Sequence, residues 1–204
     1  MAKKLSKILS YFFHPVFVPF VGVFIILNIS HLVLLPEASK RAILYMVAII
    51  TIFFPFVILP VLYYQKIISK VTVSQRRERL LPLFLTAVSY YFGYYMLNKY
   101  AVPLFLQKYM MAAFISVLLA FIISIKWKIS LHMIGIGGLI GLLSAMYHLF
   151  GLHNNIIFML SILVAGVIGT VRLYLKEHDS AQIYGGFLMG YIVTFGVVVV
   201  LSTI

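Results

Sequence analysis

The side chains able to do acid, base or anion chemistry gather in short polar segments between long apolar runs. The segment RLYLKEHDSAQIYGG (172–186) places Arg, Lys, Glu, His and Asp within eight residues, although the whole chain has only four acidic residues. The segment KVTVSQRRERLLP (70–82) holds four cations and one acid, and KWKISLHM (126–133) holds Ser130 and His132. Many cations, one hydroxyl, two imidazoles and few carboxylates are the inventory of a site for phosphate or another oxyanion.

Each of these groups has a distinct use at a phosphate. Arginine binds phosphate oxygens in a bidentate manner, lysine adds point charge, and a helix that begins near Ser130 offers free backbone N–H donors. Mg²⁺ and Ca²⁺ need carboxylates, and zinc needs three or four converging ligands that these spacings do not supply. We therefore expect no metal and no cofactor. Two imidazoles beside a bound phosphate indicate metal-free phosphoryl transfer, in which one attacks phosphorus and the other protonates the departing oxygen.

The composition decides the environment in which these segments lie. The 204 residues are 64% hydrophobic and 10% charged, with a mean hydropathy of +1.12, which lies outside the range of soluble domains. Apolar runs of about 17 to 25 residues match the thickness of a bilayer core, and alternating segments typical of transmembrane barrels are absent. The sequence predicts an all-α, polytopic membrane helix bundle. The absence of cysteine excludes disulfides, thiolate metal sites and cysteine nucleophiles.

The apolar runs predict six to seven transmembrane helices in a single membrane-embedded domain, 1–204. The basic start and following apolar run are interpreted as a retained first membrane helix, not as a secretory signal. His14, Pro15 and Pro19 interrupt the early turns of this run, so we expect a kinked or re-entrant element there. The predicted spans are 11–29, 42–64, 80–98, 109–125, 131–149, 155–171 and 183–203.

The charges lie mainly at one side of the membrane. Sixteen Lys and Arg residues against four Asp and Glu give a net charge of +12. If all seven segments cross, twelve of the sixteen cations share one side, which the positive-inside rule places in the cytoplasm. We expect this surface to contact anionic lipids of the bilayer. No basic helix, zinc pattern or aromatic RNA-binding signature accompanies the charge, so nucleic acid is not an expected partner. The segments on this side are 1–10, 65–79, 126–130 and 172–182.

Three segments resemble the three signatures of the type 2 phosphatidic acid phosphatase superfamily. In the family's order these signatures read Lys-x6-Arg-Pro, Pro-Ser-Gly-His and Ser-Arg-x5-His-x3-Asp. The matching segments, in the same order, are Lys70-x6-Arg77, Ile129-Ser130-Leu131-His132 and Arg172-x5-His178-x3-Gln182. Their order and shared side make the set more specific than any one segment alone, and the resemblance covers about residues 66–190.

The resemblance implies a membrane lipid phosphate or pyrophosphate phosphatase that works through a phosphohistidine without metal. It implies that His178 is the nucleophile and His132 the general acid, and it favours a bacterial inner (plasma) membrane. The family's site usually faces the periplasm or lumen, whereas the charge count favours the cytoplasm, so the side stays open. The residues implied to hold the phosphate are Lys70, Arg77, Ser130 and Arg172.

The chain departs from the family at the residue that orients the nucleophile. Gln182 stands where the family has Asp, and a neutral amide accepts a hydrogen bond but cannot stabilise an imidazolium through charge. Asp179 could take the orienting role only if the backbone bends suitably. This departure leaves open a catalytically degenerate protein that binds or transports lipid phosphates. An organic-anion transporter is a further alternative, although no inverted repeat is visible. The residues identify neither the lipid nor the oligomeric state.

Overall fold

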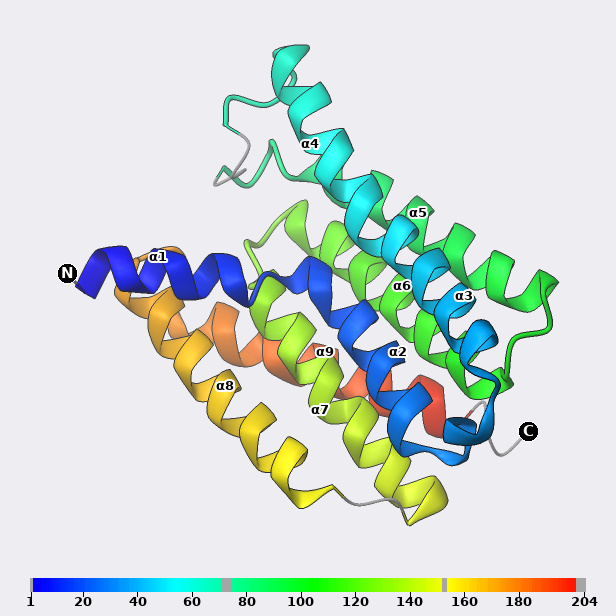
Figure 1. The fold of residues 1–204 in the computed structure, drawn as a ribbon. Helices are drawn as coiled ribbons and strands as arrows, with labels where there is room; N and C mark the ends of the chain where they lie inside the picture. Colours follow the sequence, from blue (N-terminus) through cyan, green and yellow to red (C-terminus); the bar gives the residue numbers. More distant parts are fainter. Residues whose placement is uncertain (1, 71–74, 152–153, 201–204) are drawn as a thin grey trace.

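The computed structural model describes residues 2–70, 75–151 and 154–200. It is 83% helical, and the described residues contain no β-strand. Seven helical stretches are long and apolar enough to cross a membrane, which confirms the predicted all-α bundle of an integral, multi-pass membrane protein (Figure 1). The helices are α1 (Ala2–Phe12), α2 (Val18–Ile29), α3 (Glu37–Ala48), α4 (Phe54–Tyr64), α5 (Leu80–Lys99), α6 (Leu104–Ser124), α7 (Leu131–Phe150), α8 (Asn155–Tyr174) and α9 (Ser180–Val200).

The first two apolar stretches are each made of two helices. A 3₁₀ turn, Pro15–Phe17, joins α1 to α2, and a π-helical turn, Ile49–Phe53, joins α3 to α4. A second 3₁₀ turn, His31–Leu34, lies between α2 and α3. The predicted spans have the right number and order, but the stretches begin earlier, at Glu37 and Leu104 instead of 42 and 109. Polar residues near the start of these helices, Glu37 to Arg41 in α3 and Gln107 and Lys108 in α6, interrupt the apolar pattern that was visible in the sequence.

The first stretch is interrupted where the two prolines predicted it. His14 has an extended backbone, with φ −64° and ψ 134°, and Pro15 opens the short 3₁₀ turn. Proline disfavours the α conformation in the residue before it and fits the first turn of a new helix, as Pro19 does at the start of α2. The chain therefore changes direction at His14, and α1 lies across the end of the bundle at an angle to α2 (Figure 1).

Helices α7 and α9 approach each other most closely, through small residues. A Cβ atom added at Gly190 would collide with the carbonyl oxygen of Ile134, and one at Gly137 with the carbonyl of Phe187. Such close approach through small residues is typical of helix pairs in membranes. The first turns of both helices are held together as well, because the Ser130 N–H donates to the Gln182 carbonyl at 3.2 Å. The predicted second and third signatures are thus adjacent.

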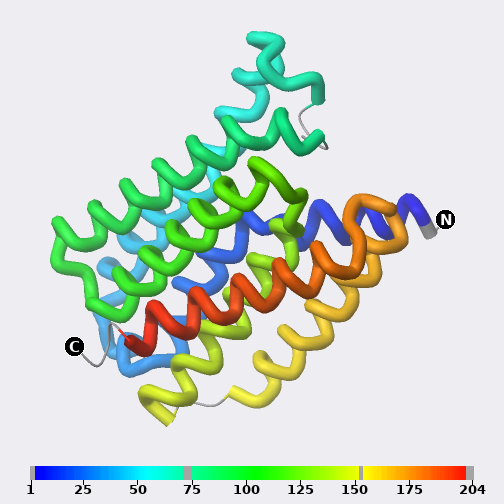
Figure 2. Tube along the Cα trace, turned by 180° about the vertical axis from the view of Figure 1, so that it is seen from behind, coloured from blue at the N-terminus to red at the C-terminus, as the bar shows by residue number. Residues whose placement is uncertain are grey.

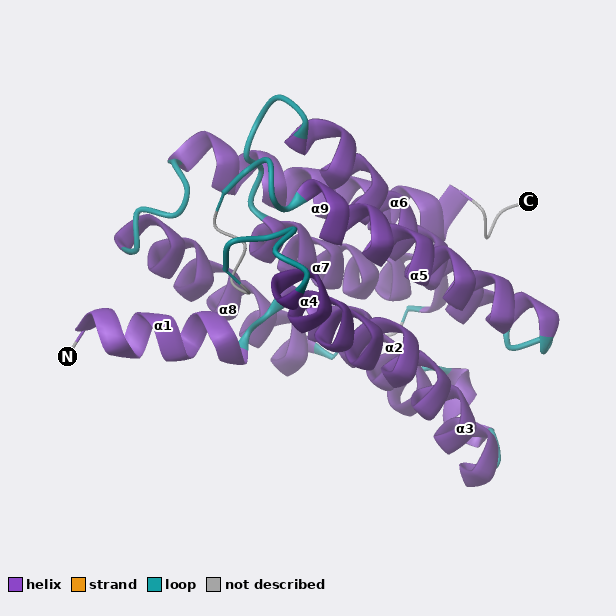
Figure 3. Ribbon diagram, turned by 90° about the horizontal axis from the view of Figure 1, so that it is seen from above, coloured by secondary structure: helices purple, strands orange, loops and turns teal. Residues whose placement is uncertain are grey.

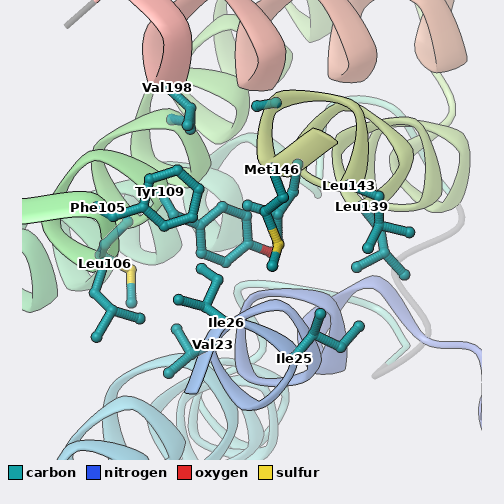
Figure 4. Close-up of a cluster of buried hydrophobic side chains, with 14 of the residues drawn as sticks. Val23, Ile25, Ile26, Phe105, Leu106, Tyr109, Leu139, Leu143, Met146 and Val198 are labelled. Atoms are coloured by element: carbon teal, nitrogen blue, oxygen red, sulfur yellow. The ribbon is translucent and has the colours of Figure 1, made fainter. Parts of the chain in front are cut away.

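A single large core holds the other helices against this pair. In it, side chains of α2, such as Val23 and Ile26, meet Tyr109 of α6 and Met146 of α7 (Figure 4). The loops that follow α4, α6 and α8 lie at the same end of the bundle (Figure 3). Seen from behind, the turn from α8 to α9 lies beside α1 (Figure 2). The polar segments that the sequence placed on one side of the membrane therefore meet.

Candidate functional site

A pocket with a volume of about 910 Å³ opens where these loops meet. Its polar end is lined by six cations and three histidines but by only one acidic residue, Glu177. This excess of positive charge suits an oxyanion and opposes a hard metal cation. The cations are Lys3, Lys7, Lys70, Arg79, Lys128 and Arg172, and the histidines are His14, His132 and His178.

The predicted catalytic and phosphate-binding residues fall into two groups. Four of the six line the pocket, although they come from segments far apart in the chain. Ser130 is fully buried and is not among the residues that line the pocket, and its Oγ has no hydrogen-bond partner among the described residues. Arg77 is exposed and is not among the residues that line the pocket. The four that the pocket brings together are Lys70, His132, Arg172 and His178.

His178 is held with one ring nitrogen directed into the protein. Its Nδ1 lies 2.9 Å from Oε1 of Gln182 and 3.3 Å from the carbonyl oxygen of Lys128. Both partners are acceptors, so Nδ1 carries the proton and Nε2 keeps its lone pair. The residue is 8% exposed, and this burial, together with the nearby Arg172, lowers the pKa of His178 to about 4. The hydrogen bond to Gln182 acts in the opposite direction and raises the pKa. A neutral imidazole with a free Nε2 is a competent nucleophile at neutral pH.

Gln182 and Asp179 have separate roles at the start of α9. Asp179 Oδ1 accepts the backbone N–H of Gln182 at 2.8 Å, the hydrogen bond of a helix N-cap. Gln182 lies one turn after His178 and supplies the side-chain oxygen that its ring contacts. The residue hydrogen-bonded to the imidazole is therefore Gln182, while the Asp179 carboxylate fixes the first turn of the helix.

Arg172, at the end of α8, has donors left over. Its Nη1 donates to Ser10 Oγ at 3.0 Å, and its Nη2 lies 3.8 Å from Glu177 Oε2. The same carboxylate oxygen lies 3.6 Å from Lys128 Nζ, so one acid is shared by two cations. Nε of Arg172 is buried without a hydrogen-bond partner among the described residues. The guanidinium retains charge and N–H groups for an anion in the pocket.

Arg79 is a pocket residue that the sequence did not single out. It is 6% exposed, and its Nη2 donates to Ser124 Oγ and to the Ile129 carbonyl, both at 2.7 Å. Burial, with Arg172 nearby, lowers the pKa of Arg79 to about 10, which leaves the guanidinium charged at neutral pH. The sequence feature that could have indicated its burial is its position directly before the apolar start of α5, where a side chain can pack against the bundle.

The other two arginines of this loop have different surroundings. Arg76 donates to the carbonyl of Ile125 and so ties the loop to the end of α6. Arg77 is exposed to solvent. Of the three arginines in this loop, the spacing Lys70-x6-Arg77 therefore pointed to the one that is exposed.

Two further histidines share the pocket with His178. His132 Nε2 lies 3.0 Å from the Ser10 carbonyl oxygen, and the centroids of the His132 and His14 rings are 5.6 Å apart. His14 Nδ1 accepts the Val16 N–H at 3.3 Å, the cap of the 3₁₀ turn. Within the ranges that the structure describes, no three His, Cys, Asp or Glu side chains are grouped so that they could hold a metal ion. The three imidazoles therefore provide acid, base or nucleophilic groups around the cations.

The remainder of the pocket is mostly apolar. Beyond the charged end, its walls come from α2, α4, α5 and α6 and reach the interior of the bundle at Tyr90 and Tyr109. This lining is complementary to an anionic group at one end and to an apolar group at the other. The apolar lining includes Phe17, Pro55, Phe56, Leu59, Pro82, Leu83 and Val117.

Comparisons of the chain with protein-family models, with curated proteins and with solved structures returned no match.

Proposed function

We propose that this membrane protein is a metal-independent phosphatase of the type 2 phosphatidic acid phosphatase kind, acting on a lipid phosphate or pyrophosphate. The observation that carries the proposal is the arrangement of His178. Its Nδ1 is engaged by Gln182, which frees Nε2, and the ring lines a pocket that has six cations at one end and apolar walls at the other. A neutral nucleophile, a positive site and an apolar channel are what this reaction requires.

In the first step, the Nε2 lone pair of His178 attacks phosphorus. The bond from phosphorus to the leaving oxygen breaks and its electron pair goes to that oxygen. His132, protonated on both ring nitrogens when the anionic substrate is bound, supplies the proton from Nδ1. Lys70, Arg79 and Arg172 neutralise the negative charge on the transferred phosphoryl group. The phosphorylated ring carries positive charge, and its Nδ1–H donates to the Gln182 amide oxygen.

In the second step, water attacks the phosphorus of phosphohistidine. His132, deprotonated by the first step, accepts a proton from this water, and the bond between phosphorus and Nε2 breaks. The electron pair returns to Nε2 of His178, and inorganic phosphate leaves. Both histidines return to their starting state, so the cycle needs no redox partner and no second substrate besides water.

The apolar part of the pocket supports a lipid as the substrate. A phosphate monoester of a small sugar would leave the aromatic and proline-rich walls unfilled, whereas an acyl or prenyl chain would bury them at about 0.8 kcal/mol per methylene group. A chain that enters from the bilayer can keep its headgroup at the membrane surface, where the cations lie. We propose a bacterial inner (plasma) membrane as the location.

A second candidate function is binding or transport of lipid phosphates without hydrolysis. Gln182 favours it, because a neutral amide gives no charge to the phosphohistidine that the first step creates. Such a protein would keep the phosphate pocket while losing turnover. An experiment that measures release and binding separately distinguishes the two candidates.

The test is inorganic phosphate release by the purified protein in detergent, in a chelator, across a panel of lipid phosphates and pyrophosphates. His178→Ala should reduce release by at least about 1000-fold, since it removes the nucleophile. The matched control is His31→Ala, because His31 is exposed and packs against Phe150 at the other end of the bundle. Retained release by His178→Ala contradicts the mechanism. Binding without release by the wild-type protein supports the second candidate.

A further inference from the structure

Helix α1 presents its polar face to the pocket. Lys3, Lys7 and Ser10 lie at positions i, i+4 and i+7 of the helix, so they share one face. All three line the pocket, and His14 follows them at the end of the same stretch. These residues lie outside the part of the chain, 66–190, that resembles the phosphatase family.

The apolar residues of α1 face outwards. Leu5, Ile8 and Phe12 are 59%, 54% and 72% exposed. A helix on a soluble protein would turn this face to the core, whereas a helix at a membrane surface places it among lipid chains. The pocket therefore has α1 as a wall whose outer surface suits the bilayer and whose inner surface carries polar groups.

Ser10 connects this wall to two residues of the proposed site. Its carbonyl oxygen lies 3.0 Å from His132 Nε2, and its hydroxyl accepts Arg172 Nη1 at 3.0 Å. These partners are 122 and 162 positions away in the sequence. Helix α1 also packs directly on α8, the helix that ends in Arg172. One residue thus contacts both the proposed general acid and a proposed phosphate ligand.

Each contact has a consequence for the proposed reaction. A carbonyl oxygen can only accept a hydrogen bond, so the Ser10 carbonyl holds the Nε2–H of His132 and directs Nδ1 to the reacting groups. A carbonyl can also stabilise the imidazolium form of an acid, as an orienting partner does in a catalytic triad. The Ser10 hydroxyl fixes Nη1 of the Arg172 guanidinium and with it the orientation of the planar group beside the pocket.

We propose that Ser10 is a positioning residue of this site, and that α1 completes the site from outside the signature segments. The inference rests on the proposed function, because positioning is defined by the roles of His132 and Arg172. It goes beyond that function in assigning a role to the N-terminal helix. Ser10 does not touch the reacting atoms; it sets the direction of two groups that do.

Three variants test the role of the Ser10 side chain. Ser10→Ala should lower kcat by about 10-fold with KM little changed, because a hydrogen bond to a charged group is lost in the transition state. Ser10→Thr keeps the hydroxyl and should restore most of the rate. Ser6→Ala is the matched control, since Ser6 is buried on α1 one turn earlier and does not line the pocket. It should leave both constants close to those of the wild-type protein.

Several outcomes overturn the proposal. The first is a kcat of Ser10→Ala equal to that of Ser6→Ala or above that of the wild-type protein. The second is a kcat of Ser10→Thr as low as that of Ser10→Ala. The third is an effect of Ser10→Ala on KM alone. A second readout, the thermal stabilisation of the protein by inorganic phosphate, separates this inference from the proposed function. If the wild-type protein binds phosphate without turnover, hydrolysis fails as the function, but Ser10→Ala should still need about 10-fold more phosphate than Ser6→Ala. Equal phosphate requirements overturn the role of Ser10, and absence of both binding and turnover overturns both proposals.

Discussion

The two loops that bring arginine to the pocket, 70–79 and 172–182, differ in how far their sequence spacing agrees with their structure. In 172–182, Arg172 and His178 line the pocket, and Gln182 contacts His178 as the spacing implied. In 70–79, the spacing selected Arg77, but the arginine at the pocket is Arg79.

The difference follows from what holds each loop. The segment 172–182 consists of the last residues of α8, the short turn 175–179 and the first residues of α9, so the two helices fix where its side chains lie. His178 lies just before α9, and Gln182 lies four residues later in its first turn. The loop before α5 instead depends on side-chain contacts, both within the loop and with α6. Ser69 binds the Glu78 carboxylate at 2.9 Å, and Ser124 of α6 accepts from Arg79. Spacing is informative where a helix carries the residues and much less so in an irregular loop.

The largest expected effect tests this contrast within one loop. Arg79→Gln should lower kcat/KM by about 100-fold, because it removes a buried charge that faces the phosphate. Arg77→Gln should change it by less than about 3-fold, because an exposed cation is screened by solvent. Phosphate release measured for both variants checks the comparison. Arg79→Lys adds a control, since it keeps the charge but loses the planar donors that bind Ser124 and Ile129.

A larger loss of kcat/KM for Arg77→Gln than for Arg79→Gln would mean that the loop moves when substrate binds. The spacing from Lys70 would then identify Arg77 correctly as the phosphate-binding arginine. Equal and small effects would remove this loop from the site. Circular dichroism of each variant excludes unfolding as the cause of any loss.

The sequence predicted the features that depend on local patterns. Apolar runs identified seven spans, and the prolines after His14 predicted the interruption of the first one. The burial of Arg79 and the contacts of Ser10 could not be predicted in this way, because their partners lie 45 to 162 positions away. Tertiary packing alone decides which of several neighbouring cations is buried and which faces solvent.

A smaller effect is expected at Gln182, where the loop 172–182 departs from the family. Gln182→Ala should lower kcat by about 10-fold, because Nδ1 of His178 loses its side-chain acceptor and the ring its orientation. Gln182→Asp supplies a carboxylate, which raises the pKa of the imidazole and stabilises the phosphohistidine. Its activity should therefore fall at a higher pH on the acid side than that of the wild-type protein. Asp179→Asn, at the α9 cap, controls for effects on the helix start. A Gln182→Ala protein with an unchanged rate would mean that the Lys128 carbonyl alone orients His178.

The smallest effect concerns stability and tests whether His178 is as deeply held as its contacts indicate. Its pKa in the folded protein is about 4, below the value of about 6.5 for an exposed imidazole in the unfolded chain. Between these values the unfolded state binds more protons, so stability is fully present above about pH 6.5 and is lost as pH falls towards about pH 4. A His178→Gln variant lacks this titration. As pH falls from about 6.5 towards about 4, the thermal midpoint of the wild-type protein should therefore decrease more than that of His178→Gln. A difference that stays constant with pH would show that His178 titrates alike in both states, and that its ring is open to solvent much as the exposed Arg77 is.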